Sequence, residues 1–413
     1  MYRLFNLYRN SFANIQKNIW ILSITMLINR SGSMVLLFTS LYLTKELHFT
    51  IADAGIAMSF YGIGSVLGSY AGGWLTDRKN FFDIMILSLI SSGCILLFML
   101  VVTTPFLISW VIFAYAFSSD MFRPANSKAI SLYSTPANRT RSVSLVRLAI
   151  NLGFSVGPAA GGFIAFYWGY KWLFVVDAFT SMAAAVMLYN YLPRQPNEPQ
   201  KTPSMVLNNR STSAYRDSTY LVFILLVALF GICFFQLFAS IPQYFNTVSG
   251  YDEGTIGLLL ALNGILVVVI EMPLVSFLEK KQKIFPFIIA GVACIPISFC
   301  ILQFGQGWMF MAILYTIMMT LSEIFAMPFM MNYTLSRASV ERQGQYAALY
   351  SMSYGLANIA APLLGLGIAS KYGFNILFDV LILLSLITAI GFLMLSKQAT
   401  KLKSSLPEML TEK

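Results

Sequence analysis

Apolar stretches of about 20 residues recur along almost the whole chain, separated by short polar segments. A helix of that length crosses the hydrocarbon core of a bilayer, which is about 30 Å thick. The composition agrees, because 57% of the 413 residues are hydrophobic and only 11% are charged. The sequence therefore predicts an all-α integral membrane protein with twelve transmembrane helices. The predicted spans are 19–44, 53–75, 82–103, 106–128, 143–167, 171–192, 218–246, 254–278, 284–304, 307–331, 343–370 and 374–396.

The net charge of +10 is explained by topology. With the N-terminus inside the cell, 21 of the 27 lysines and arginines fall in cytoplasmic segments, and only Lys45, Lys171 and Lys371 fall in external loops. The positive-inside rule then predicts a multi-pass protein with both termini in the cytoplasm. The expected location is a bacterial inner (plasma) membrane. No nucleic-acid partner is expected.

Several kinds of catalytic site lack the residues that they need. The single histidine, His48, lies in an external loop, and the four cysteines all lie in apolar spans without metal-ligand spacing. The sequence contains no Walker A motif for binding a nucleotide. We therefore expect no enzymatic activity, no metal and no cofactor, which leaves an ion gradient as the energy source.

A long polar connection divides the chain into two halves. It is rich in proline, asparagine and serine and follows the sixth predicted span, as expected of a cytoplasmic linker. The predicted parts are an N-terminal six-helix bundle with a short leader (1–192), the linker (193–217), a C-terminal six-helix bundle (218–396) and a cytoplasmic tail (397–413).

The two halves resemble each other at a nearly constant offset, which indicates a duplicated bundle. Substrate is then expected where the two bundles meet. Corresponding residues lie 202 to 204 positions apart: Asp77 with Glu279, Asp120 with Glu323, and Gly169 with Gly373.

The segment "GGWLTDRKN" ends the second predicted span. It resembles the G-x-x-x-D-R-x-G-R-R signature of the major facilitator superfamily, with Gly73, Asp77 and Arg78 in place but Asn80 where the family has glycine. The resemblance implies the fold of that superfamily, two pseudo-symmetric six-helix bundles. An aspartate at the cytoplasmic face can bridge to a cation or to a helix N-terminus of the other bundle, so these residues and the counterpart Glu279 are predicted to form a gate. The alternative is a solvated loop whose charges only orient the chain.

The fifth predicted span contains "GFSVGPAAGG". This segment is similar to the G-x-x-x-G-P-x-x-G-G pattern of the drug:proton antiporter branch of the same superfamily. Glycines four residues apart leave a smooth stripe on one helix face, and a proline beside them introduces a kink. The resemblance implies a gating role for Gly153, Gly157, Pro158, Gly161 and Gly162; the alternative is ordinary close packing of helices.

Six ionisable residues inside the predicted spans are candidates for function, since each opposes membrane insertion by about 3 kcal/mol. They should have partners or line a wet cavity. Arg30 lies near the bilayer midplane beside Asn29 and is predicted to bind a substrate carboxylate or phosphate, unless it forms a structural pair with a buried acid. The six are Arg30, Asp120, Arg123, Arg147, Glu271 and Glu323.

Two of these arginines are further candidates for substrate binding. Arg123 lies three residues after Asp120 on the same predicted helix, so the two side chains share a face and can neutralise each other. Such a pair is either scaffolding or a proton switch that frees the arginine for substrate. Arg147 is the second candidate, although it is near enough to the cytoplasmic end of its span to reach the lipid headgroups.

The three acids are the predicted proton carriers. Glu271 and Glu323 have no arginine or lysine one turn away, which suits reversible protonation near neutral pH, whereas Asp120 has Arg123. For Glu323 the alternative is a hydrogen bond that fixes a bend at Pro328.

These observations together predict a proton-coupled secondary transporter that works by alternating access. The resemblance to drug:proton antiporters favours export of a small drug-like molecule or metabolite by a monomer in contact with membrane lipid. A second hypothesis is proton-coupled uptake of an anionic or zwitterionic nutrient such as a peptide, and a third is a non-transporting membrane receptor.

Overall fold

The computed structural model describes residues 11–32, 34–35, 38–39, 42–49, 51–195, 213–281 and 283–411, and every regular element within them is a helix. The main helices are α2 (Lys17–Gly32), α4 (Ile51–Arg78), α5 (Phe81–Met99), α6 (Pro105–Asp120), α7 (Phe122–Tyr133), α8 (Arg139–Trp168), α9 (Lys171–Tyr191), α10 (Ser218–Phe234), α11 (Ile241–Thr247), α12 (Glu253–Glu279), α13 (Phe285–Phe304), α14 (Met309–Arg337), α15 (Gln343–Tyr372) and α16 (Phe374–Thr411). Four short turns of helix join them: η1 (Tyr42–Glu46), η2 (Ala214–Arg216), η3 (Phe235–Leu237) and η4 (Val340–Arg342).

The helices correspond in order to the twelve predicted spans, and the predicted all-α membrane fold is confirmed. Within the described residues, nine helical segments are long and apolar enough to cross a bilayer. The other three predicted spans fall on α2, α4 and α8, which have 16, 28 and 30 residues. The fourth span is the pair α6 and α7, which meet at Met121.

Local sequence explains where several helices begin and end. The side chain of Asn80 accepts a hydrogen bond from the Phe82 amide and caps α5, and Asp217 caps α10 in the same way. The helix α8 ends at Gly169 with φ of 90°, and α15 ends at Gly373 with φ of 86°. These two glycines are a corresponding pair of the repeat, and only glycine adopts that backbone conformation readily.

The described residues form two compact units that do not follow the chain order. Unit 1 comprises Met1–Ala214, Val267–Glu279 and Thr334–Gly355, and unit 2 comprises Tyr215–Leu266, Lys280–Tyr333 and Leu356–Lys413. One end of α12 and one end of α15 therefore belong to unit 1. The leader residues 1–10 and most of the predicted linker (196–212) lie outside the described residues, so the predicted domain boundaries stay a prediction.

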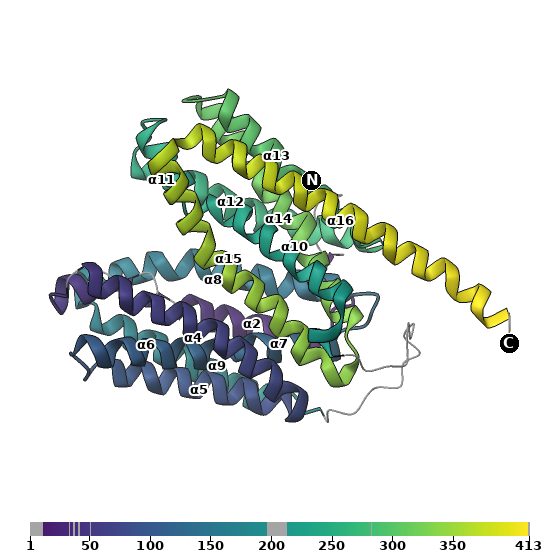
Figure 1. The fold of residues 1–413 in the computed structure, drawn as a ribbon. Helices are drawn as coiled ribbons and strands as arrows, with labels where there is room; N and C mark the ends of the chain where they lie inside the picture. The colour runs from purple at the N-terminus through teal and green to yellow at the C-terminus, as the bar shows by residue number, and fades with distance from the viewer. Residues whose placement is uncertain are drawn as a thin grey trace. The chain divides into compact units, whose positions relative to one another are not determined.

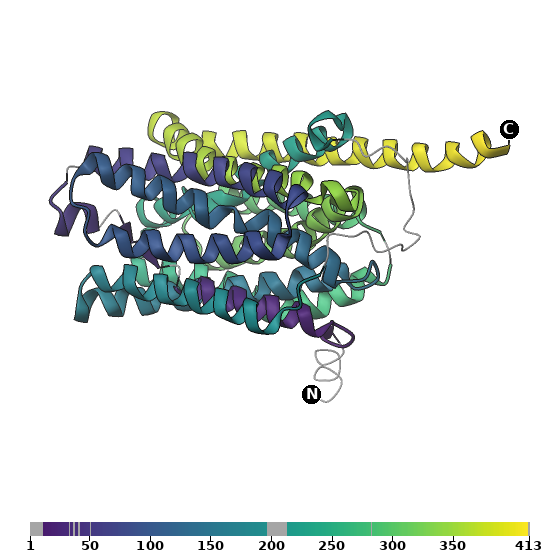
Figure 2. The ribbon, with the colours of Figure 1, turned by 90° about the horizontal axis from the view of Figure 1, so that it is seen from below.

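Unit 1 is built from long helices packed side by side. The helix α4 packs along α6, α5 packs along α6 and α9, and α2 lies against α8 and α9. Figures 1 and 2 both show α4, α5 and α6 as neighbours in purple and blue. One core cluster includes Tyr42 and Phe174, whose rings meet edge to face with centroids 4.8 Å apart.

Unit 2 has an aromatic core. The helix α16 packs against α13 and α10, and it appears in yellow as one continuous helix in Figure 2. The rings of Phe299, Phe378, Tyr244 and Tyr315 pack together, with centroid separations from 5.0 to 5.9 Å along the chain of contacts. Such rings bury large apolar areas, so this core holds the helices of unit 2 in place.

Candidate transport site and gates

Asp77, at the end of α4, caps the N-terminus of α15 within unit 1. Its two carboxylate oxygens accept hydrogen bonds from the backbone amides of Gly344 at 2.7 Å and Gln345 at 3.0 Å. The first amides of a helix have no intrahelical partner and carry a partial positive charge, so a carboxylate is stabilised there. Of the two partners expected from the sequence, a cation or a helix N-terminus, the structure shows the helix N-terminus.

Two glycines allow this close approach. A Cβ atom at Gly73 would collide with the side chain of Ala348, and one at Gly344 would lie 2.7 Å from the Asp77 carboxylate. Nearby, the ammonium group of the buried Lys128 donates to the carbonyl of Thr76 at 2.9 Å. The end of α4 is therefore held by small residues and backbone hydrogen bonds.

Burial raises the pKa of the Asp77 carboxyl to about 6, against the lowering effect of the two amide hydrogen bonds. Asp77 lies two residues beyond the predicted apolar span 53–75, at the rim of the membrane. The carboxyl is therefore mostly ionised at pH 7 and takes up a proton on mild acidification.

Glu279, at the end of α12, caps the N-terminus of α8, again within unit 1. One carboxylate oxygen accepts from the amides of Thr140 at 2.8 Å and Arg141 at 3.3 Å, and the other lies 2.7 Å from Nε of Arg141. Thr140 and Arg141 stand 204 positions before Gly344 and Gln345, the residues that Asp77 binds. The repeat therefore has two corresponding caps.

Arg78 takes no part in either cap. Its guanidinium lies over the ring of Trp74, 3.8 Å from the centroid, where a cation is stabilised by the aromatic face. Its predicted gating role stays untested.

The glycine stripe of α8 packs against α2. A Cβ at Gly153 would lie 2.6 Å from the Cβ of Arg30, and one at Gly161 would lie 2.7 Å from that of Met34. A Cβ at Gly157 would touch the Arg30 backbone at 3.3 Å, and one at Gly162 would lie 3.8 Å from the Phe38 ring. Gly153 and Gly157 therefore bring α8 close to α2, and Gly161 allows a close approach to Met34 just beyond α2, as the smooth stripe predicts; at Gly162 a Cβ would make only an ordinary contact. The side chain of Pro158 lies outside the described residues.

Arg30 lies in the last turn of α2. Its guanidinium lies 5.5 Å from the centroid of the Phe154 ring, and no ion pair joins it to an acid within the described part of the chain. The neighbouring Asn29 donates to the Ser181 hydroxyl of α9 at 3.1 Å. These contacts orient the end of α2 against both α8 and α9.

Asp120 and Arg123 form the local ion pair that their spacing predicts. Nε of Arg123 lies 2.6 Å from Oδ1 of Asp120 across the junction of α6 and α7. The other carboxylate oxygen accepts a hydrogen bond from the Ser65 hydroxyl of α4. The acid is buried while the arginine side chain is one-third exposed, so one end of the pair remains accessible.

Glu271 is paired with Arg147, a cation from another helix. Nε of Arg147 in α8 lies 3.2 Å from Oε1 of Glu271 in α12, and the glutamate is 0% exposed. The spacing on its own helix correctly excluded a local cation but could not reveal one 124 positions away. Two predicted functional residues are thus brought together in unit 1.

Glu323, in α14 of unit 2, lies next to the polar side chain of Asn263 in α12. The amide nitrogen of Asn263 lies 3.5 Å from its carboxylate and 2.9 Å from the hydroxyl of Thr320. Glu323 is 7% exposed, and Pro328 lies within the same helix. Both readings of Glu323, proton carrier and structural hydrogen-bond partner, remain predictions.

One buried acid, Asp177 of α9, was not among the predicted site residues. It is 1% exposed and lies inside the predicted span 171–192. A charged residue inside a predicted span is the same signal that indicated the other buried charges, and it could have indicated Asp177. Arg30 interacts with it electrostatically. Unit 1 therefore contains a polar cluster made of Arg30, Tyr61, Tyr115, Asp120, Arg123 and Asp177.

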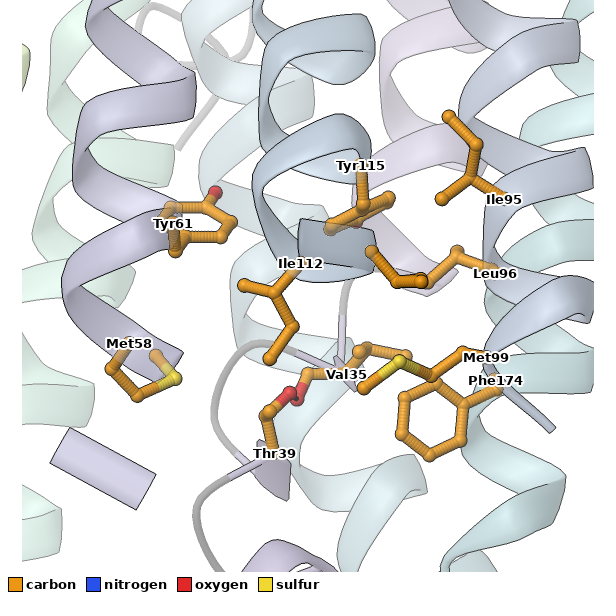
Figure 3. Close-up of a pocket in the computed structure, with 11 residues that line it drawn as sticks. Val35, Thr39, Met58, Tyr61, Ile95, Leu96, Met99, Ile112, Tyr115 and Phe174 are labelled. Atoms are coloured by element: carbon orange, nitrogen blue, oxygen red, sulfur yellow. Dashed lines mark hydrogen bonds between the residues drawn. The ribbon is translucent and has the colours of Figure 1, made fainter. Parts of the chain in front are cut away.

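A narrow apolar pocket adjoins this cluster. Figure 3 shows Tyr61 and Tyr115 on one side and Met99 and Phe174 on the other, with Thr39 among the lining residues.

The fold and these contacts define a helical membrane protein with a repeated helix-capping device. The chain belongs to the Major Facilitator Superfamily, which residues 19–360 match. The superfamily predicted from the two motifs is thereby confirmed.

Relatives are distant but nearly full-length. The Quinolone resistance protein NorA of Staphylococcus aureus is 24% identical over 84% of this chain and 86% of its own length. A Na(+), Li(+), K(+)/H(+) antiporter of Planococcus maritimus is 22% identical over 86% of this chain and 89% of its own. Among solved structures, a bacterial homologue of the iron transporter ferroportin, in an outward-facing state, has a TM-score of 0.71 at 16% identity and covers 92% of this chain and 100% of its own. This last similarity concerns the fold alone.

Proposed function

We propose that this transporter exports a small organic molecule, drug-like or a metabolite, in exchange for protons. It works by alternating access as a monomer surrounded by lipid in a bacterial inner membrane, with both termini in the cytoplasm. It requires no cofactor, because the proton gradient supplies the energy.

The ion pair of the buried Glu271 with Arg147 is the observation that carries the proposal. A fully buried carboxylate is stable as an anion only with a partner, and Arg147 lies 3.2 Å away. Protonation of Glu271 removes the attraction and leaves the arginine able to move. Coupling of protons to a conformational change requires a group whose protonation lets a neighbouring charged side chain move. Glu271 and Arg147 are such a pair.

The two caps supply the second requirement, a contact that closes and opens. Asp77 and Glu279 each hold the N-terminus of a helix from the other half of the sequence. Because each contact is a few hydrogen bonds rather than a packed core, it breaks without unfolding either helix. We assign these caps to the cytoplasmic gate.

The choice of export and of protons is supported by the relatives. NorA is named for quinolone resistance, and the Planococcus protein is named as an antiporter that exchanges cations for H(+). Quinolones are therefore suitable first probes for this chain.

The test uses purified protein in liposomes with an imposed pH gradient and a fluorescent quinolone as the probe. We expect accumulation that follows the gradient. Glu271→Gln should abolish this accumulation but still permit exchange of quinolone across the membrane without a gradient, since the amide mimics the protonated acid. The control is Glu341→Gln, an exposed acid of η4 that precedes the predicted span 343–370, which should transport as the wild type does.

Two results would contradict the proposal. If the wild type does not move quinolone, ethidium or other cationic dyes in response to the gradient, drug export is excluded. If Glu271→Gln still concentrates the probe, this glutamate is not the coupling residue, and Glu323 and Asp120 are tested next by the same substitution to the amide.

Arg30 favours a second candidate function, proton-coupled uptake of an anionic or zwitterionic nutrient such as a peptide. Its guanidinium has no ion pair among the described residues and so is available to a carboxylate. Uptake of labelled dipeptides and organic acids in the same liposomes, with the gradient reversed, separates this function from export.

A further inference from the structure

Asp177 differs from the other buried acids in its surroundings. Asp120 and Glu271 each have an arginine partner, and Glu323 lies beside Asn263. Neither carboxylate oxygen of Asp177 makes a hydrogen bond of good geometry or an ion pair within the described residues, although neutral donors lie close to it and the residue is only 1% exposed. An ionised carboxylate in such a place is very unfavourable, so the neutral acid is the stable form.

The groups around Asp177 come from several packed helices. Arg30 of α2 is the charged group that faces it, and the remaining polar groups are neutral. They are the Val35 amide, the Tyr115 hydroxyl of α6, the Ser181 hydroxyl of α9 itself and, at longer range, the Tyr61 hydroxyl of α4. The contribution of α5 to the neighbouring pocket is apolar, from Ile95, Leu96 and Met99 (Figure 3).

Arg30 and Asp177 are close in the fold but are not joined by an ion pair. The Asn29 side chain donates a hydrogen bond to the Ser181 hydroxyl. Asn29 directly precedes Arg30 in α2, and Ser181 lies one helical turn after Asp177 in α9. A Cβ atom at Gly32 would overlap the Thr180 side chain, which shows how closely α2 and α9 pack. The long arginine side chain therefore needs only a change of rotamer, and no separation of the helices, to approach the acid.

We propose that Asp177 is a proton-binding site of the transport cycle and that Arg30 controls it. In the conformation described here the acid is protonated and Arg30 lies over the Phe154 ring. When Arg30 turns toward α9, the O–H bond of the carboxyl breaks, the proton passes to water, and the carboxylate pairs with the guanidinium. The return of Arg30 to Phe154 allows a proton from water to reload the acid. This inference rests on the proposed proton-coupled function and adds a site in the N-terminal half of the chain.

The test measures proton binding directly, without any substrate. Infrared difference spectra of the purified protein in lipid, recorded from about pH 5 to 9, report the carbonyl band of each protonated carboxyl. We expect a band that disappears within this range and is absent in Asp177→Asn. Glu271→Gln and Glu323→Gln are matched controls that should keep the band.

Arg30→Gln tests the control by the arginine. Without the cation the acid should hold its proton more tightly, so the band should persist to a pH higher by about one unit or more, a tenfold change in proton affinity. Arg30→Lys keeps the charge and should move the midpoint less. A purely structural role for Arg30 would leave the midpoint where it is.

Three results would overturn the inference. The band of Asp177→Asn could match the wild type, no band could be present at any pH, or a band could remain unchanged over the whole range, in which case the acid never releases its proton. Should Asp177→Asn not fold, Asp177→Glu should shift the band rather than remove it, and an unshifted band would contradict the assignment.

A transport measurement separates this inference from the proposed function. Asp177→Asn should lose gradient-driven accumulation of the quinolone and keep exchange without a gradient. If the wild type transports the probe and Asp177→Asn accumulates it normally, the inference fails while the proposed function stands. If the wild type moves no probe, the proposed function fails, and the infrared titration still decides whether Asp177 binds a proton.

Discussion

The two helix caps of unit 1 are built from the same parts but are reinforced differently. Asp77 binds the amides of Gly344 and Gln345, and Glu279 binds the amides at the corresponding positions in α8. Both contacts use the unpaired amides and the dipole at the start of a helix. Duplication therefore preserved the backbone geometry of the cap.

The side chains around the caps have diverged. Arg141 adds an ion pair to Glu279 at 2.7 Å, whereas Gln345 stands at the corresponding position beside Asp77. Conversely, Gly73 permits the close approach of α15 to α4, while Val275 occupies the corresponding place in α12. The Glu279 cap depends on charge and the Asp77 cap depends on close backbone contact, so the two should respond differently to mutation and to pH.

The largest expected effect comes from Glu279→Ala. It removes two amide hydrogen bonds and the ion pair, and hydrogen bonds to charged groups contribute about 1.5–3 kcal/mol each. The measurement uses a parent variant without the four native cysteines that carries Ser142→Cys, a buried position in the first turn of α8. Adding Glu279→Ala to this parent should make labelling of the new cysteine at least about tenfold faster. Labelling at the rate of the parent would show that Glu279 does not hold the contact.

Arg141→Gln should have an intermediate effect, because it gives the Glu279 cap the composition of the Asp77 cap. The two amide bonds remain and the partly buried ion pair is lost, so we expect labelling of Ser142→Cys to rise by about threefold to tenfold. Arg141→Lys is the control that keeps the charge. If both variants match the parent, the ion pair contributes nothing to closure.

Gln345→Arg makes the reciprocal change and should strengthen the Asp77 cap. An arginine there should pair with Asp77 as Arg141 pairs with Glu279, and labelling of Ala348→Cys, which is buried against Gly73, should slow by about threefold. Gln345→Met, of similar length without charge, is the matched control. Faster labelling in Gln345→Arg would show that the two caps are not interchangeable.

The smallest expected effect is the pH dependence of the Asp77 cap. Burial raises the pKa of Asp77 to about 6 from 3.8, so the closed cap binds a proton more tightly than an exposed carboxyl does. Acidification from about pH 7 to 5 should therefore favour the closed cap, and a rise in pH through 6 should weaken it. The labelling rate of Ala348→Cys is measured with Asp77 and with Asp77→Asn at each pH, so that the pH dependence of the thiol cancels in the ratio of the two rates. This ratio should fall on acidification. A ratio independent of pH would exclude titration of Asp77 in this window.

The fold was largely predictable because membrane insertion imposes simple rules. Helices spanning the bilayer must be about 20 apolar residues long, and the described helices follow the predicted spans in order. The duplicated glycines, Gly169 and Gly373, end corresponding helices with positive φ. Contacts between residues close together in the sequence were also predictable. Asp120 and Arg123 form the expected ion pair because residues three apart share a helix face.

Contacts between helices were decided by the tertiary structure. The pairing of Glu271 with Arg147, the position of Asp177 beside Arg30 and the approach of Asn263 to Glu323 each join segments far apart in the sequence. They depend on the rotation and depth of each helix relative to its neighbours, which side-chain packing sets and hydropathy does not encode. The sequence by itself determined the class of protein, the helices and the types of residue able to form a gate or carry a proton. Only the tertiary structure decided which acid forms an ion pair with another helix and which is buried without an ion pair, because that difference arises from which helix faces meet.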